Sequence, residues 1–212
     1  TALQALAGAA QSEEADVRRA ALIGLGLARR PEALPLLIAA TQSPDPATRL
    51  VAISALADAS SPHVLPALAK AARDTDESVR AAALGFLASN PSPEATAVLV
   101  DLLREPLVDR ERLLRMLAMA NEGRVAGLLG ALETADDEVA KELTSALARI
   151  RTPEATTALL STLSGAAVPA RKAAATALAS FGTLEATAAL RRASETDPDL
   201  GVRQICSVLL AQ

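Results

Sequence analysis

The chain has one histidine, His63, and one cysteine, Cys206, so the side chains that most often carry acid–base, nucleophilic or zinc chemistry are scarce. A zinc site takes about four ligands, and no second histidine or cysteine is present to help build one. A reactive thiol needs exposure and nearby positive charge, whereas Cys206 shares its repeated position with apolar residues only. We therefore expect His63 on the surface and Cys206 in the core, and we assign no metal ligand.

Carboxylates are the remaining candidates for chemistry, because the chain has 25 acidic residues against 21 lysines and arginines. Most of these acids stand where helices are predicted to begin, so capping and the helix dipole account for them. Neither a glycine-rich phosphate-binding loop nor an H-E-x-x-H motif occurs. We expect no catalytic residues, no enzyme activity and no cofactor.

The composition also disfavours two classes of partner, nucleic acids and the membrane interior. The formal net charge is -4, and the chain has no Trp, no Tyr and two Phe, which disfavours nucleic acid, since its binders need cationic and stacking side chains. The longest uncharged run, residues 155–170, is shorter than the roughly 18 residues of a membrane span. We expect a cytoplasmic protein without a membrane span.

The residues that position any site repeat along the chain. Leucine recurs at 25, 56, 87, 117, 147, 178 and 210, and a second row of leucines occupies 6, 37, 68, 99, 129, 159 and 190. Each interval holds two predicted helices, called here helix A (for example 76–89) and helix B (for example 93–104). A unit of this size cannot bury its own apolar face, so neighbouring units must stack.

The sequence of the repeated helices resembles that of a known repeat family. "DPATRLVAISAL" (45–56) and "DESVRAAALGFL" (76–87) form helix A, and "PEATAVL" (93–99) forms helix B. This pattern resembles HEAT-like repeats, in particular the short subtype of the phycobilin lyases. The resemblance implies an all-α, right-handed α-α superhelix (an α-solenoid) of about seven two-helix repeats, in a single domain over residues 1–212. Because the sequence starts on a helix B and ends on a helix A, we expect a segment of a larger protein.

One row of arginines has two interpretations. Arginine lies at the same place of helix A at 18, 49, 80, 110, 171 and 203, and the exception is Ala140. An acid lies four residues before this place at 14, 45, 76, 136 and 199, and the exceptions are Pro106 and Ala167. The arginines could form a basic ridge for an anionic partner. They could also pair with acids that cap their own or a neighbouring helix A, which is the role that the resemblance implies. We favour this structural role.

The middle of the chain departs from the pattern. Residues 104–124 hold five arginines and both methionines. Here Arg112 and Glu142, with Glu111 and Lys141 beside them, suggest two ion pairs between repeats. A polar contact site is the alternative, because broken repeat rules often accompany function.

The resemblance places helices B along the inner curve. Helical spacing then predicts an exposed face with an acidic edge and a floor of small residues. The candidate partner-binding residues on it are Glu32, His63, Glu94, Asp101, Arg124, Glu154 and Glu185. We expect a non-enzymatic protein–protein interaction scaffold that binds a protein or peptide, basic in character, along this face. The alternative is a lyase-like or chaperone-like factor that handles a tetrapyrrole or another prosthetic group.

Overall fold

A computed structural model describes residues 2–57 and 61–211, and every regular element in those ranges is a helix. The chain forms two compact units: unit 1 comprises residues 1–89 with 104–108, and unit 2 comprises residues 90–103 with 109–212. The prediction of an all-α protein made of two-helix repeats is confirmed. The prediction of a single domain over residues 1–212 stays a prediction.

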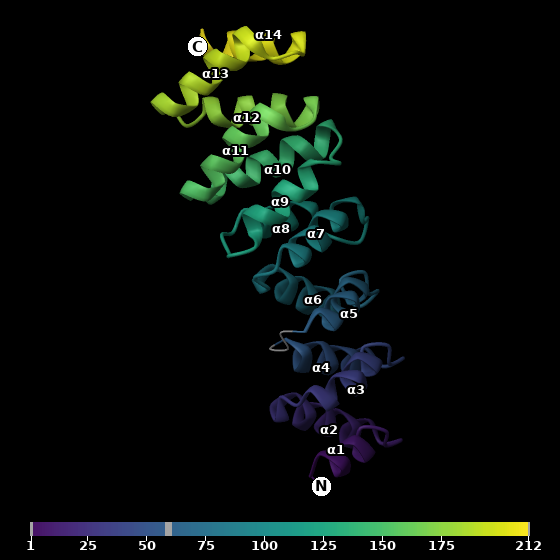
Figure 1. The fold of residues 1–212 in the computed structure, drawn as a ribbon. Coiled ribbons are helices and arrows are strands. Elements are labelled where there is room, and N and C mark those ends of the chain that lie inside the picture. Colours follow the sequence, from purple (N-terminus) through teal and green to yellow (C-terminus); the bar gives the residue numbers. More distant parts are fainter. Residues whose placement is uncertain (1, 58–60, 212) are drawn as a thin grey trace. The chain divides into compact units, whose positions relative to one another are not determined.

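Unit 1 alternates helices B and A along the sequence (Figure 1). Its helices B are α1 (Ala2–Ala9), α3 (Leu34–Ala40) and α5 (Leu65–Ala71), and short 3₁₀ turns, η1 (Pro31–Ala33) and η2 (Pro62–Val64), lead into the last two. Its helices A are α2 (Ala15–Ala28), α4 (Pro46–Leu56) and α6 (Glu77–Ser89). The helices A pack on one another in chain order, and each helix B packs on the helix A that follows it.

Unit 2 continues the alternation. Its helices B are α7 (Pro93–Asp101), α9 (Arg124–Leu132), α11 (Pro153–Gly165) and α13 (Leu184–Thr196), and the 3₁₀ turn η3 (Leu102–Arg104) follows α7. Its helices A are α8 (Arg110–Leu117), α10 (Asp137–Ile150), α12 (Val168–Ala179) and α14 (Leu200–Leu210). Helices A pack in one layer and helices B in another, each on its neighbours in chain order.

The helices begin where the sequence provides caps. The carboxylates of Asp45, Asp109, Asp136 and Asp199 each accept a backbone N–H in the first turn of a helix A. Ser92, Thr152 and Thr183 do the same for helices B through their hydroxyl groups. These acceptors satisfy N–H groups that have no partner within the helix, which explains the regular placement of acids and hydroxyls.

The predicted leucine rows form most of the core. In helix A the row is fully or almost fully buried at six positions, Leu25, Leu56, Leu87, Leu117, Leu147 and Leu178. In helix B the buried members are Leu37, Leu68, Leu99, Leu159 and Leu190. The interhelical layers therefore consist of leucine from both helices of each repeat, with alanine filling the space between them.

The rows are not buried at three positions: Leu6 and Leu210, in the first and last helices, are half-buried, and so is Leu129 in the middle of the chain. Leu129 is half-buried, whereas Leu128 is fully buried and Leu132 almost so. The turn before α9 reads "NEG" in place of the usual Ser/Thr-Pro-Glu. The buried leucine of α9 therefore comes one residue sooner after the leucine of the preceding helix A than it does in the neighbouring repeats. Leu128 therefore occupies the core position, and Leu129 is turned towards the surface.

The arginine row ties consecutive loops together. The Nε and Nη2 atoms of Arg49 donate to both carboxylate oxygens of Asp74, at 2.7 and 2.6 Å, and Arg171 binds Asp197 in the same way at 2.9 Å for both bonds. The remaining Nη1 of each arginine donates to backbone carbonyls of the loop before its own helix, such as Ser43 O for Arg49. This confirms the structural role of the row.

The acids that pair with the row differ from the predicted ones. The predicted partners, such as Asp76 and Asp199, cap helix A, and the bidentate pairs are made by the residues two positions earlier, Asp74 and Asp197. A cap carboxylate is occupied by the N–H groups of its own helix, so the loop acid before it is the one free to turn towards the preceding repeat. The capping acid Asp45 also receives Arg19, at 2.9 Å.

These contacts change the acidity of the loop acids. The hydrogen bond from Arg49 holds the pKa of Asp74 below its ordinary value in spite of burial. Burial alone would raise the pKa of Asp197, but hydrogen bonds from Arg171 and from the Asp199 N–H, with the charges of Arg171 and Arg203, lower it overall. Both acids therefore stabilise the folded state in the ionised form.

The packing of α9 gives a direct test of its register. Leu128→Ala should lower the free energy of unfolding by about 2–5 kcal/mol, because it removes buried methyl groups and leaves a cavity. Leu129→Ala should cost roughly 1 kcal/mol or less, since its side chain is partly in water already. Urea denaturation of the two variants measures both values, and equal losses would contradict the register.

The loop acids predict a pH dependence. Because the pKa of Asp197 is lowered on folding, its stabilising effect is complete above the unfolded value of about 3.9 and is lost as the pH falls through the folded value. Asp197→Asn should cost about 1–3 kcal/mol at neutral pH and should lessen the loss of stability in acid. Glu195→Gln, an exposed change in the same unit, should leave the acid limb of the stability profile in place.

Candidate functional site

The predicted partner-binding residues lie on helices B, and all but one of them are exposed. In unit 1, Glu32 lies in η1 and His63 in η2. In unit 2, Glu94, Glu154 and Glu185 are the second residues after the caps of α7, α11 and α13, and Asp101 ends α7. The capping hydroxyls of Ser92, Thr152 and Thr183 satisfy the first-turn N–H groups. The glutamate carboxylates are therefore not needed as caps and face solvent.

A hollow accompanies this face in unit 2. It has a volume of about 460 Å³ and lies between α9 and α11, and it is lined by Leu129, Pro153, Glu154, Thr157, Ala158 and Ser161. Glu154 belongs to the predicted acidic edge of helix B, and Thr157 and Ser161 are small residues of the same exposed face. The shifted Leu129 adds an apolar side chain to the hollow. The sequence predicted the acidic edge and the small floor, but not this apolar contact.

The prediction that Arg124 lies on the exposed face is wrong. Its side chain is fully buried in unit 2, where Nη1 donates to Thr96 Oγ1 at 3.1 Å and Nε donates to Met119 O at 3.2 Å. Burial lowers the pKa of its guanidinium. Through the shifted register of α9, Arg124 falls in the row of Ala33, Ala95, Ala155 and Ala186, all of which are buried.

Two glycines allow α9 and the turn before it to come close to α7 beside this buried arginine. A Cβ atom on Gly127 would come within 2.4 Å of Thr96 Cβ, and one on Gly123 within 2.2 Å of the Pro91 carbonyl oxygen. Neither distance is possible for real side chains, so α9 and the turn before it approach α7 more closely than any other residue type would allow. Arg124 therefore joins α7 to the turn between α8 and α9, and it takes no part in the exposed acidic edge.

The ion pairs predicted for the irregular middle segment are also different. Glu142 pairs with Arg110, at 2.8 Å to Nε and 2.9 Å to Nη2, and not with Arg112. Glu111 lies 3.6 Å from Arg115 on its own helix, and not beside Lys141. Arg110 therefore acts as Arg49 and Arg171 do, with a helix A glutamate in place of the loop acid. Arg115 is exposed and lies on the surface of α8.

The two single reactive side chains lie where the sequence predicted them. His63 is exposed, and Cys206 is fully buried in α14. Burial raises the pKa of the Cys206 thiol, and the nearby charge of Asp197 acts in the same direction. A thiol in this environment stays protonated and does not react readily.

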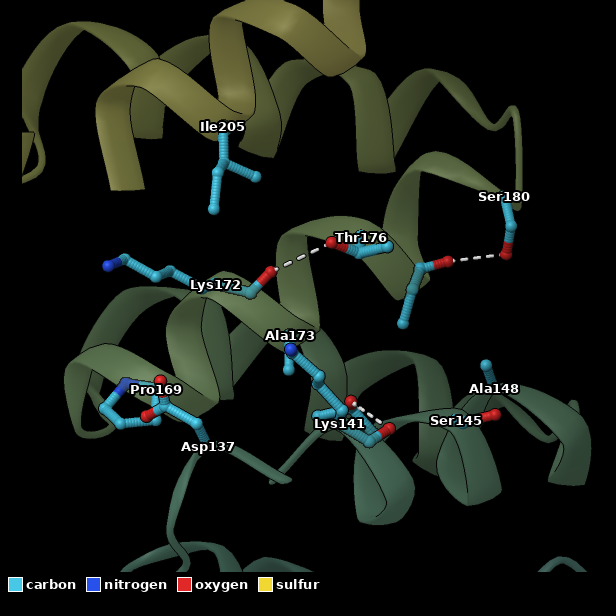
Figure 2. A pocket seen from close by; sticks show the side chains of 12 residues that line it. Asp137, Lys141, Ser145, Ala148, Pro169, Lys172, Ala173, Thr176, Ser180 and Ile205 are labelled. Atoms are coloured by element: carbon cyan, nitrogen blue, oxygen red, sulfur yellow. Dashed lines mark hydrogen bonds between the residues drawn. The ribbon is translucent and has the colours of Figure 1, made fainter. Parts of the chain in front are cut away.

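A second hollow in unit 2 lies on the other layer, between α10 and α12, with a volume of about 400 Å³ (Figure 2). Its lining includes Asp137, Lys141 and Ser145 of α10, Lys172, Thr176 and Ser180 of α12, and Ile205 of α14. Thr176 donates its hydroxyl to Lys172 O at 3.2 Å and Ser180 donates to Ala177 O at 2.6 Å, so both serve their own helix. Small side chains in α10 and α12 produce this groove, which the sequence analysis did not identify.

Neither hollow brings together a nucleophile, a base and a group that orients it. Within the described ranges, no cluster of three or more His, Cys, Asp or Glu side chains has a geometry suited to a metal ion. In the same ranges, no helix has the length and apolar character needed to cross a membrane. What the arrangement offers is an exposed acidic edge beside a shallow apolar hollow, which suits recognition of another molecule.

Comparison with known proteins gives the fold a family. The family model of HEAT repeats matches residues 1–71, 36–120 and 125–211. Among curated protein sequences nothing matches. Among solved structures, the complex of CpcE and CpcF of phycocyanin lyase from Nostoc sp. PCC7120 is similar, with 22% identity, a TM-score of 0.51, and coverage of 98% of this chain and 94% of that one.

Two further structures show weaker likeness. An archaeal HEAT-like repeats protein from Thermococcus onnurineus NA1 has 17% identity and a TM-score of 0.42, over 99% of this chain and 95% of that one. Human deoxyhypusine hydroxylase has 20% identity and a TM-score of 0.43, over 99% of this chain and 83% of that one. These levels of identity bear on the fold alone. Because the family model covers nearly the whole sequence, the chain belongs to the HEAT-repeat family.

Proposed function

We propose that this HEAT-repeat chain is a non-enzymatic scaffold that binds a basic segment of another protein along the exposed face of its helices B. The observation that carries the proposal is the hollow between α9 and α11, where Glu154 stands beside Thr157, Ser161 and the half-buried Leu129. A cytoplasmic location belongs to the same proposal.

The chemistry of this face favours a segment with both charge and apolar contacts. Leu129, Pro153 and Ala158 supply apolar surface at the hollow, and Thr157 and Ser161 are small enough to let a partner's backbone come close. Glu154 adds the charge that would select lysine or arginine, and Glu94 and Asp101 repeat it on α7 in the same unit. Charges at the edge of such a surface act chiefly on the association rate.

The way in which polar side chains are engaged within the fold also supports binding along helices B. On helices A, Arg110 and Arg171 are held by loop carbonyls and by the acids Glu142 and Asp197. On helices B, the exposed glutamates have no capping work, because Ser92 and Thr152 perform it. The exposed glutamates of helices B are therefore available to a partner.

The alternative function, a factor that handles a tetrapyrrole, would use the same repeats differently. The phycocyanin lyase structure is similar in fold, but at 22% identity the likeness carries no function. A flat aromatic ligand is usually held by aromatic side chains, and the chain has two Phe and neither Trp nor Tyr. A change in the visible absorbance of a bilin on mixing with the protein would support the alternative and overturn the scaffold proposal.

Charge reversal tests the proposed face. The double variant Glu94→Lys/Glu154→Lys should slow association with a labelled peptide that carries lysine at every fourth position by roughly tenfold or more, because it removes electrostatic attraction. Raised salt should slow the unmodified protein in the same way. Stopped-flow fluorescence measures both rates.

The matched control is Glu111→Lys/Asp137→Lys, which makes the same change in net charge at two exposed acids of helices A in the same unit. It should change the association rate much less. Equal effects of the two double variants would mean that the attraction depends only on the net charge of the protein, which would contradict a site on helices B. A defect that appears only on changing Arg112 and Arg115 would place the contact in the irregular segment 104–124.

A further inference from the structure

Three loops between a helix B and the next helix A share one pattern. They read "SPD" at 43–45, "DTD" at 74–76 and "DPD" at 197–199, and the third residue of each caps the helix A. In the second and third loops the first residue is an aspartate held by two arginines. One arginine binds its carboxylate and the next donates to its carbonyl oxygen.

Asp74 shows the complete arrangement. Arg49, 25 residues before it, donates two hydrogen bonds to its carboxylate, at 2.7 and 2.6 Å. Arg80 donates to its carbonyl oxygen at 2.7 Å. The carboxylate also accepts the Asp76 N–H at 2.9 Å, which shapes the loop. Two guanidinium groups thus converge on one loop residue, and its carboxylate supplies the negative charge between them.

Ser43 occupies the same place in the first loop. Its hydroxyl accepts the Asp45 N–H at 3.3 Å, and its carbonyl oxygen accepts Arg49 Nη1 at 2.9 Å, so the loop keeps its shape. Arg18 lies 25 residues before Ser43, as Arg49 does before Asp74. A serine has no carboxylate to offer, and the negative charge that the other two loops supply is missing here.

Arg18 makes the bonds to backbone carbonyls that Arg49 makes, but not the bonds to a carboxylate. Its Nη1 donates to Ser12 O at 2.6 Å and to Glu13 O at 3.3 Å. Across residues 2–57 and 61–211, neither its Nε nor its Nη2 makes a hydrogen bond, and no acid forms an ion pair with it. The neighbouring Arg19 takes Asp16 and Asp45, which are the nearby acids of α2 and α4.

A hollow of about 270 Å³ lies at this point in unit 1. Arg18, Gln11, Gln42, Ser43 and Thr48 provide its polar wall, and the apolar wall is formed by Ala10, Leu22, Leu36, Ala39 and Ala40. Its size suits a carboxylate with a few carbon atoms attached. The guanidinium edge that binds Asp74 or Asp197 elsewhere in the chain is here left for a group from outside.

We propose that Arg18 binds an external carboxylate carried on a short apolar body, which takes the place that the Asp74 side chain takes at Arg49. Two parallel N–H···O bonds to the Nε and Nη2 edge fix the carboxylate, as bidentate pairs do elsewhere. The apolar body lies against Leu22 and Leu36. The site is separate from the acidic helix B face of the proposed function, and it selects the opposite charge.

A single substitution can place a carboxylate from the protein itself at Arg18, where it would compete with the external ligand. Ser43→Asp converts "SPD" into the sequence found at 197–199, so the loop has a precedent in the same protein. The new side chain should occupy Arg18 from within and block the site. Ser54→Asp adds the same charge at an exposed position of α4 and serves as the matched control.

Butanoate and acetate are the probes, titrated at constant ionic strength against chloride while the ¹H–¹⁵N spectrum is recorded. In the unmodified protein, butanoate should shift the Arg18 Nε–H and the amides of Gln42 and Ser43 in a saturable way, and more strongly than acetate. In Ser43→Asp and in Arg18→Gln the dissociation constant should rise roughly tenfold or more, as expected for a charge-assisted pair. Ser54→Asp should bind as the unmodified protein does.

The source of the carboxylate is distinguished with a blocked peptide, acetyl-Ala-Glu-Ala-amide, and its Gln counterpart. Shifts with butanoate and with the Glu peptide would assign the site to an acidic side chain of a partner. Shifts with butanoate alone would assign it to a free carboxylic acid. Absence of a saturable shift with either, or equal binding by the unmodified protein and Ser43→Asp, would overturn the proposal. Arg18→Gln gives the same decision if Ser43→Asp does not fold.

Discussion

The structure depends on a shared layer of leucine, because a pair of helices with one apolar face cannot exclude water from that face alone. The leucines of the helix A row are at most 1% exposed in both units: Leu25, Leu56 and Leu87 in unit 1, and Leu117, Leu147 and Leu178 in unit 2. The spacing of the sequence follows from this. A repeat that fell out of step would place leucine in water and leave a cavity in its neighbour, so the interval changes by no more than a residue or two.

Burial of leucine does not by itself fix how consecutive repeats are oriented, and hydrogen bonds between the loops provide that constraint. Each bidentate pair, such as Arg49 with Asp74 or Arg171 with Asp197, joins a helix A to the loop before the next helix A, while Nη1 of the same arginine holds the loop before its own helix. One side chain therefore sets the distance between two loops. Because Arg49 and Arg171 are engaged within the fold in this way, they are not available to a partner, and this is one reason why we propose recognition along helices B.

The repeat and its core were predictable from the sequence, because leucine at a fixed interval indicates a repeated buried contact, and eleven of the fourteen marked leucines are buried. The register of α9 was not, since it depends on Gly123 and Gly127 letting α9 approach α7. The burial of Arg124 follows from that shift. The partners of the arginines were missed because a capping acid and a loop acid two residues apart look alike in sequence, and only the fold shows which one faces the preceding repeat.

Two departures from the repeat have opposite consequences, and the difference lies in what surrounds the guanidinium. At Arg124 an arginine replaces alanine in the core, and the Thr96 hydroxyl and the Met119 carbonyl enclose it, so the charge serves packing. At Arg18 the arginine is the regular residue and its partner is replaced, by Ser43, beside a hollow that reaches solvent. A polar group that the fold encloses becomes part of the core, whereas one whose partner has been removed at the surface becomes a place where a ligand can complete the repeat.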